Sequence, residues 1–173
     1  TDKRHYGQIV VQTFPLIGNY GVIHADFEGD KPYVTGYIVR DWCQVPSNFR
    51  SEGSLDAFLK THHVTGLYGI DTRELTKTLR QHGTMNGRIT ATPPAGVTDQ
   101  IKQYTIQNPV AAVSCKTPFT EVGGTGQNDR HKVALLDCGY KESTRRALLN
   151  HHCEVTVFPH HTPAKDIVAY QPD

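Results

Sequence analysis

The stretch that decides the fold is Lys132-Val-Ala-Leu-Leu-Asp137, followed by residues 142–151 (ESTRRALLNH) and residues 154–158 (EVTVF). The first and third runs are continuous, apolar and of strand length, and the run between them is typical of a helix. Residues 163–170 (PAKDIVAY) predict a second short helix that begins at a proline. Strand, helix, strand, helix with apolar strands is typical of the opening of a parallel α/β sheet.

The residues before this sheet predict a connection between two domains. Residues 116–131 hold Pro118, Gly123, Gly124 and Gly126 among polar side chains, which is the composition of an inter-domain linker. The sequence therefore predicts three parts: a domain at residues 1–115, a linker at 116–131, and the start of an α/β domain at 132–173.

The first part mixes strands and short helices in an irregular order. Three runs rich in β-branched residues predict strands, and they are residues 8–14 (QIVVQTF), 33–40 (YVTGYIVR) and 87–92 (GRITAT). Ser54 can cap a short helix, and residues 98–104 predict a further weak helix. This order indicates an α+β domain.

The clearest local signal in this part is Asp71-Thr-Arg-Glu74 before a helical run that stops at Gly83. Asp71 can cap the helix, and Glu74 occupies the position of a capping-box carboxylate. Charge and hydroxyl groups at a helix start can also face a partner. Asp71, Thr72 and Arg73 are therefore candidate docking residues, as is Asn19 in the turn-rich loop at 15–21, although a plain capping motif explains the first three equally well.

Composition excludes several classes of function. The chain has 173 residues, 37% of them apolar and 20% charged, and a formal net charge of +1. Its basic residues are scattered, which argues against nucleic acid as a partner. Apolar stretches fall short of the roughly 20 residues of a membrane helix. Four widely spaced cysteines (Cys43, Cys115, Cys138 and Cys153) are typical of reduced thiols in a cytoplasmic protein.

The residues alone predict no catalytic, cofactor or metal site. Cys138 follows an apolar strand and precedes a glycine, as a nucleophile does, but Asp137 stands where an elbow has another glycine. The pairs His151-His152 and His160-His161 are separated by a strand, so they lie too far apart to share one zinc ion. The glycines at 18–21 and 123–126 lack the spacing of a nucleotide-binding loop.

Both ends of the sequence suggest a piece of a longer chain. Thr1 is not an initiator methionine and leads within a few residues into a strand. At the other end, two parallel strands cannot bury both faces of a doubly wound sheet. We therefore expect further chain on both sides, and a C-terminal half-domain that is unstable by itself.

Several stretches taken together resemble the small subunit of carbamoyl phosphate synthetase. The N-terminal stretches are GQIVV (7–11), PLIGNYG (15–21), PSNFR (46–50), GIDTRELT (69–76), LR (79–80) and GTMNG (83–87), in the order of that family. VALLDCGYK (133–141), CEVTVFP (153–159) and TPA (162–164) resemble the start of its class I glutamine amidotransferase domain. The resemblance covers nearly the whole chain.

The resemblance implies an overall α/β fold with a flavodoxin-like parallel sheet after the linker. It also implies that the whole subunit hydrolyses glutamine and passes ammonia to a large subunit, which makes carbamoyl phosphate from bicarbonate and two ATP. The cysteine, histidine and glutamate of the glutaminase would lie beyond Asp173, so no catalytic residue is carried over to this chain. ATP and metal ions would belong to the large subunit, and the chain itself would act as a scaffold that docks it.

One residue departs from the family pattern, because the family mostly has phenylalanine where this chain has Cys138. We therefore expect different packing at that turn. Two other interpretations remain open: a non-catalytic interaction module with a flavodoxin-like half, and another class I glutamine amidotransferase.

Overall fold

The computed structural model describes residues 1–92, 96, 98–124 and 130–173. These residues form two compact units. Unit 1 comprises Thr1 and His5–Gln107, and unit 2 comprises Asp2–Arg4 and Asn108–Asp173. The structure is mixed α/β with parallel sheets, which confirms the predicted fold class in its coarse form.

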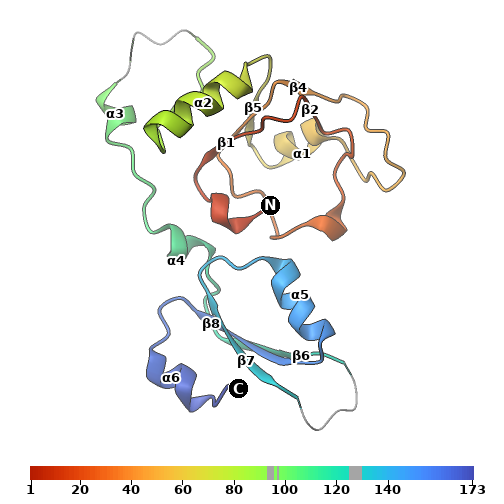
Figure 1. Ribbon diagram of the computed structural model, residues 1–173, viewed down its shortest axis with the longest axis vertical. Coiled ribbons are helices and arrows are strands. Elements are labelled where there is room, and N and C mark those ends of the chain that lie inside the picture. The colour runs from red at the N-terminus through yellow and green to blue at the C-terminus, as the bar shows by residue number, and fades with distance from the viewer. Residues whose placement is uncertain (93–95, 97, 125–129) are drawn as a thin grey trace. The chain divides into compact units, whose positions relative to one another are not determined.

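Unit 1 consists of short strands and helices (Figure 1). The 3-10 helix η1 (Lys3–His5) opens the chain, and it is followed in order by β1 (Ile9–Val11), β2 (Leu16–Ile17), the 3-10 helix η2 (His24–Asp26), β3 (Gly36–Ile38), β4 (Asp41–Trp42), α1 (Leu55–Thr61), β5 (Thr65–Leu67), α2 (Thr72–His82) and α3 (Asp99–Lys102).

The strands of unit 1 pair in parallel. One sheet has the order β1-β3-β5, with Val11 opposite Ile38 and Ile38 opposite Leu67, and a second sheet pairs β2 with β4. This differs from the α+β expectation, in which pairing is mostly antiparallel. The physical reason is the length of the connections, residues 12–35 and 39–64, because a parallel pair needs a crossover of about a dozen residues or more.

Two of the three predicted strands are present but shorter than expected, as β1 and β3. The prediction of a strand at 87–92 is wrong: these residues have no strand pairing in the described part of the chain. Ile89 instead packs its side chain close to Gly36 of β3. The alternating pattern of 87–92 thus supplies an apolar contact to the sheet without joining its hydrogen-bond ladder.

The helix caps of unit 1 follow the sequence prediction. The Ser54 side chain accepts a hydrogen bond from the Ala57 N–H (3.2 Å) at the start of α1. Asp71 accepts from the N–H groups of Arg73 and Glu74 (3.1 Å each) at the start of α2, and Gly83 ends that helix with a φ of 77°. Glu74 pairs with Lys77 instead of completing a capping box.

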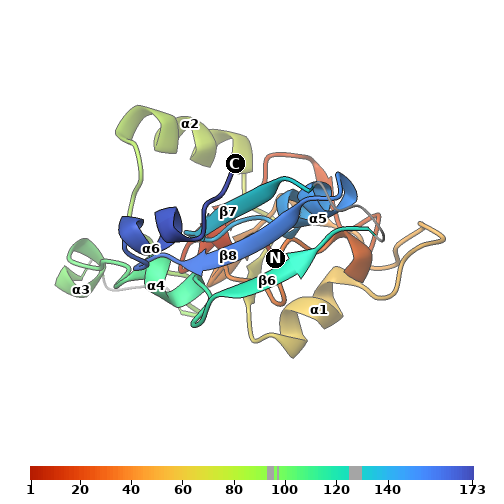
Figure 2. The same cartoon turned by 90° about the horizontal axis from the view of Figure 1, so that it is seen from below.

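Unit 2 contains a three-stranded sheet and three α-helices among its described residues. Its elements are α4 (Pro109–Val113), β6 (Phe119–Val122), β7 (Lys132–Asp137), α5 (Glu142–Asn150), β8 (Glu154–Pro159) and α6 (Ala164–Ala169), with η1 contributing Lys3 and Arg4. The strand order is β6-β8-β7, with β7 parallel and β6 antiparallel to β8, as Figure 2 shows. The predicted strand–helix–strand–helix order from 132 onward is confirmed.

Strand β8 is the centre of unit 2. Val155 and Val157 are fully buried and pack with Leu148 and Leu149 of α5, while Phe158 stacks edge-on against Tyr170 beside α6. Successive residues of a strand face opposite sides of the sheet. The two helices therefore cover opposite faces, and β8 is apolar on both because both faces are packed.

Strand β6 is the main departure from the predicted linker at 116–131. It pairs with β8 along four residues, and Thr120 and Thr156 share a hydrogen bond between their hydroxyls (2.7 Å). The expectation that this segment lacks regular structure is wrong for Phe119–Val122. The segment belongs to unit 2, whose longer run is Asn108–Asp173. Residues 125–129 of the predicted linker, with Gly126, lie outside the described residues.

A glycine and an ion-pair group fix β6 against α5. Gly123 donates its N–H to the Cys153 carbonyl (2.9 Å), and a side chain at Gly123 would overlap the Leu149 carbonyl at the end of α5. Arg145 of α5 pairs with Glu121 of β6 and with Glu142 on its own helix. The close approach requires glycine at position 123.

The buried carboxylate of Asp137 ties together the segments at the carboxyl end of β7. Asp137 is fully buried and accepts hydrogen bonds from the N–H groups of Cys115 (2.7 Å), Gly139 (2.9 Å) and Tyr140 (3.3 Å). Nearby, Ser114 accepts from the N–H of His160 (3.0 Å) just after β8. Residues 114–115 thus cross the ends of both parallel strands.

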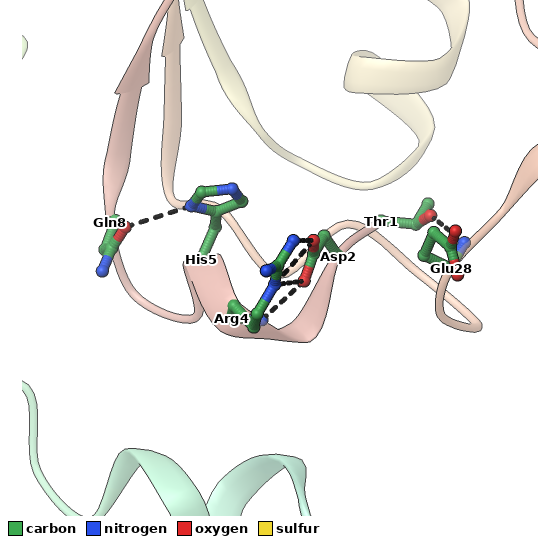
Figure 3. A network of polar contacts seen from close by, with 6 residues as sticks. All are labelled: Thr1, Asp2, Arg4, His5, Gln8 and Glu28. Atoms are coloured by element: carbon green, nitrogen blue, oxygen red, sulfur yellow. Dashed lines mark hydrogen bonds and ion pairs between the residues drawn. The ribbon is translucent and has the colours of Figure 1, made fainter. Parts of the chain in front are cut away.

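Local polar pairs hold the first residues of the chain, as Figure 3 shows. Within unit 2, the guanidinium of Arg4 pairs with the carboxylate of Asp2. Within unit 1, Thr1 accepts from the Glu28 N–H (2.9 Å) and His5 bonds to Gln8 (3.2 Å). These pairs are exposed or half-buried, so each is expected to contribute little to stability.

We expect the stabilising effect of Asp71 to depend on pH. The backbone N–H of Glu74, donated to the carboxylate, holds the pKa of Asp71 below its ordinary value of 3.8. A lowered pKa in the folded state means that the stabilisation is present above the ordinary value and is lost as pH falls through the folded-state value. Asp71→Ala should lower the urea midpoint at pH 6, and this difference should shrink below about pH 4.

The matched variant for that experiment is Asp71→Asn, because asparagine also caps helices well but does not ionise. It should keep most of the urea midpoint at pH 6 and should lack the pH dependence. A deficit of Asp71→Ala that is constant from pH 6 to about pH 2.5 would show that the carboxylate charge is irrelevant to the cap.

Thr72 offers a second test, because its side chain is fully buried and its hydroxyl has no hydrogen-bond partner among the described residues. Thr72→Val keeps the branched shape and removes this unpaired group, so the free energy of unfolding should be unchanged or higher. Thr76→Val is the control, because it removes the bond from the Thr76 hydroxyl to the Thr72 carbonyl (2.7 Å). A loss above about 1 kcal/mol for Thr72→Val would contradict this account.

The stability of unit 2 should depend on the carboxylate of Asp137. Asp137→Asn preserves shape but turns an NH2 group toward backbone N–H donors, so unfolding should become easier by roughly 2–4 kcal/mol. Asp166→Asn on the exposed side of α6 is the control and should change stability by less than about 0.5 kcal/mol. Equal stability of the two variants in thermal unfolding would show that the hydrogen bonds to the Asp137 carboxylate do not stabilise unit 2.

Candidate functional site

The carboxyl edge of the sheet β1-β3-β5 collects the segments that carry the predicted docking residues. Because the three strands are parallel, the chain leaves all of them at the same edge, after Val11, Ile38 and Leu67. Backbone hydrogen bonds continue beyond the strands, from the Gln12 N–H to the Ile38 carbonyl and from the Gly69 N–H to the Arg40 carbonyl (2.9 Å each). This edge is the candidate site of unit 1.

Asn19 lies in the loop that follows β2. The loop is held by β4 and the residues after it: Cys43 donates its N–H to the Ile17 carbonyl (2.8 Å), and Ser47 donates to the Asn19 carbonyl (3.1 Å). Gly21 has a φ of 70° and no room for a side chain beside Ser51. The loop is therefore a fixed turn in which Asn19 is half-buried.

Asp71, Thr72 and Arg73 lie in succession at the start of α2, but they face different surroundings. The Asp71 carboxylate is already engaged by its own helix, and the positive charges of Arg40 and Lys77 add to the effect of the hydrogen bonds in lowering its pKa. Arg73 is exposed. This helix start is thus capped from within and offers no open anion site.

Thr72 does not fit the predicted docking role, because its side chain is fully buried. As the first residue of α2, it turns toward the interior of unit 1 while Arg73 turns outward. No hydrogen bond or ion pair joins Asn19 to Asp71 or Arg73 within 1–92, 96 and 98–107. A shared docking role of Asn19, Asp71 and Arg73 stays a prediction.

Two exposed features of unit 1 were missed from the sequence. Arg73, Lys77 and Arg80 are all exposed on α2 at spacings of four and three residues, which place them on one helix face. Four aromatic side chains in the segments after β1, β3 and β5 are also largely exposed: Phe14 (63%), Tyr20 (70%), Phe49 (96%) and Tyr68 (65%). The sequence could have predicted the shared helix face of the basic residues from their spacing, but it could not have predicted that the aromatic rings are exposed.

Cys138 is exposed in the turn after β7, in unit 2. No hydrogen bond joins it to a histidine in the part of unit 2 that the structure describes, whereas a thiol nucleophile is typically hydrogen-bonded to such a base. Burial raises the pKa of the neighbouring Cys115 thiol, which disfavours the reactive thiolate. Because Cys138 is exposed, its side chain takes no part in the buried core of unit 2, and the expectation of different packing at this turn stays a prediction.

The histidine pairs occupy the places expected for them. His151 and His152 follow α5, and His160 and His161 follow β8, where their rings lie 5.1 Å apart. Among the described residues, no three side chains of histidine, cysteine, aspartate or glutamate are grouped so that they could hold a metal ion. The helices within these residues are also too short or too polar to cross a membrane.

Comparison with known proteins relates both units to one family. Residues 1–89 match the family described as "Carbamoyl-phosphate synthase small chain, CPSase domain". The carbamoyl phosphate synthase small chain of Clostridium perfringens is 42% identical over 175 residues, covering 100% of this chain and 49% of that protein. The pyrimidine-specific small chain of Halalkalibacterium halodurans is 42% identical, covering 100% of this chain and 47% of that protein.

A third relative, the small chain of Caldanaerobacter subterraneus subsp. tengcongensis, is 40% identical over 173 residues, covering 100% of this chain and 46% of that protein. The chain spans about half the length of the curated relatives it matches. The similarity extends through unit 1 and unit 2 alike. The chain belongs to the carbamoyl phosphate synthase small chain family.

Proposed function

We propose that this chain is part of the small chain of a glutamine-dependent carbamoyl phosphate synthase. In this proposal the whole small chain hydrolyses glutamine to glutamate and ammonia. The ammonia passes to a large chain, which makes carbamoyl phosphate from bicarbonate and two ATP. The observation that carries the proposal is identity of about 42% along the whole chain to small chains of this enzyme.

Within this proposal, the two units have different roles. Unit 2 supplies β7, α5, β8 and α6 of the amidotransferase sheet, in which ligands bind beyond the carboxyl ends of the strands. The buried Asp137 holds that edge in place through its three backbone donors. Unit 1 docks the large chain, with Asn19, Asp71 and Arg73 near the contact.

The proposed chemistry needs groups that these residues do not provide. Acyl transfer from glutamine requires a thiolate nucleophile, a histidine that moves the proton to the leaving ammonia, and amide donors for the oxyanion. Cys138 is exposed and has no histidine hydrogen-bonded to it in the described part of unit 2, and Cys115 has a raised pKa. We therefore propose that the nucleophile, its histidine and a glutamate lie beyond Asp173, and that ATP and metal ions bind the large chain.

The match at 1–89 favours this function over another class I amidotransferase, because that segment is characteristic of the synthase small chain. A non-catalytic interaction module with a similar α/β half is the other alternative. It would bind a partner but would release no glutamate in any form of the protein.

The test is the release of glutamate from glutamine by the 173-residue chain and by a full-length small chain carrying it. We expect hydrolysis from the full-length chain and none from the 173 residues. No hydrolysis from either would favour the interaction module. Hydrolysis by the 173-residue chain would place the nucleophile within it, and loss of that activity in Cys138→Ser would identify the residue.

A further inference from the structure

The outer face of α2 carries a row of basic side chains. Arg73, Lys77 and Arg80 are exposed and follow the spacing of one helix face, over seven residue steps or about 10 Å of helix. α2 lies at the margin of unit 1 in both Figure 1 and Figure 2. We name these three side chains the basic face of α2.

The opposite face of the helix packs into unit 1. Thr72 is buried, and Leu75, Thr76 and Leu79 are half-buried at positions three, four and seven residues after it. Because these residues are buried or half-buried while Arg73, Lys77 and Arg80 are exposed, the fold presents the basic face to the outside of unit 1.

The charges around this face are not balanced. Lys77 pairs with Glu74 (3.1 Å), and Arg40 lies close enough to Asp71 to lower its pKa, after the hydrogen bonds described above. Neither Arg73 nor Arg80 forms an ion pair among residues 1–92, 96, 98–124 and 130–173. Four cations thus face two carboxylates, and the excess lies on the two arginines.

Exposed apolar side chains flank the basic face in the sequence at both ends. Tyr68 (65% exposed) precedes α2, and Met85 (51% exposed) follows it. Arginine, tyrosine and methionine are enriched in protein interfaces compared with the rest of a protein surface. The composition therefore favours a protein partner.

We propose that the basic face of α2 docks an acidic surface of the carbamoyl phosphate synthase large chain. This inference rests on the proposed function and specifies the contact within it. The charge of this face favours an acidic partner surface, because the two arginines without an ion pair among the described residues attract carboxylates and steer association. The proposed function supplies the large chain as that partner. The row is short and the chain as a whole has a net charge of only +1, which disfavours nucleic acid.

The test uses a full-length small chain carrying this sequence and the large chain, with the dissociation constant measured at low and moderate salt. The variant Arg73→Glu/Lys77→Glu/Arg80→Glu should bind at least about tenfold more weakly, because like charges then face each other. The variant Arg73→Gln/Lys77→Gln/Arg80→Gln should show a smaller loss and a weaker salt dependence. Glutamine keeps a good helix propensity, so circular dichroism should be unchanged.

The control is Lys60→Glu/Lys102→Glu, which reverses two exposed charges of unit 1 on α1 and α3. It should bind as tightly as the unaltered protein. Equal affinity of the triple charge reversal and this control would overturn the inference while leaving the proposed function intact. Failure of the unaltered small chain to bind the large chain at all, or salt-sensitive binding to nucleic acid instead, would overturn both.

Discussion

Because β1, β3 and β5 pair in parallel, the segments that follow the three strands all start at the same edge of the sheet. Each connection is long enough to cross back to the start of the next strand, so residues distant in sequence leave the sheet side by side. The loops, the second strand pair β2–β4 and the start of α2 all depend on that arrangement. If the strands paired antiparallel, successive exits would alternate between opposite edges, and Arg40 would not lie beside Asp71.

Unit 2 also contains a parallel strand pair, β7–β8, but it adds an antiparallel strand to that pair. Two parallel strands by themselves are too few to form an α/β sheet that is buried on both faces. β6 adds an antiparallel neighbour to β8, so that β8 becomes central and its two faces pack under α5 and α6. Asp137 and Ser114 then fasten residues 114–115 across the carboxyl ends of β7 and β8. These hydrogen bonds hold the turn after β7 against residues 114–115.

Local signals predicted much of the fold and missed what depends on distant contacts. β7 and β8 were readable because both are continuous apolar runs, and Asp71 was readable because a cap acts within three residues. β6 was missed because Phe119–Val122 is short and mostly exposed, and its partner lies more than 30 residues later. The run 87–92 has strand composition but pairs with no strand in the described part of the chain, so tertiary context overrode its preference.

In the candidate site, too, local features were predictable from the sequence and features that depend on distant contacts were not. Asp71 and Arg73 are exposed at the start of α2, and their docking role stays a prediction. The burial of Thr72 depends on which way α2 packs, which three residues cannot reveal. The family relation follows from the whole chain. The proposed supply of ammonia to a large chain, and the proposed docking through α2, both rest on that relation. The most direct measurement is carbamoyl phosphate synthesis by the large chain, with glutamine or ammonia as nitrogen source. We expect glutamine to support synthesis only when the full-length small chain is added. Unchanged synthesis from glutamine with and without the small chain would contradict the proposed function.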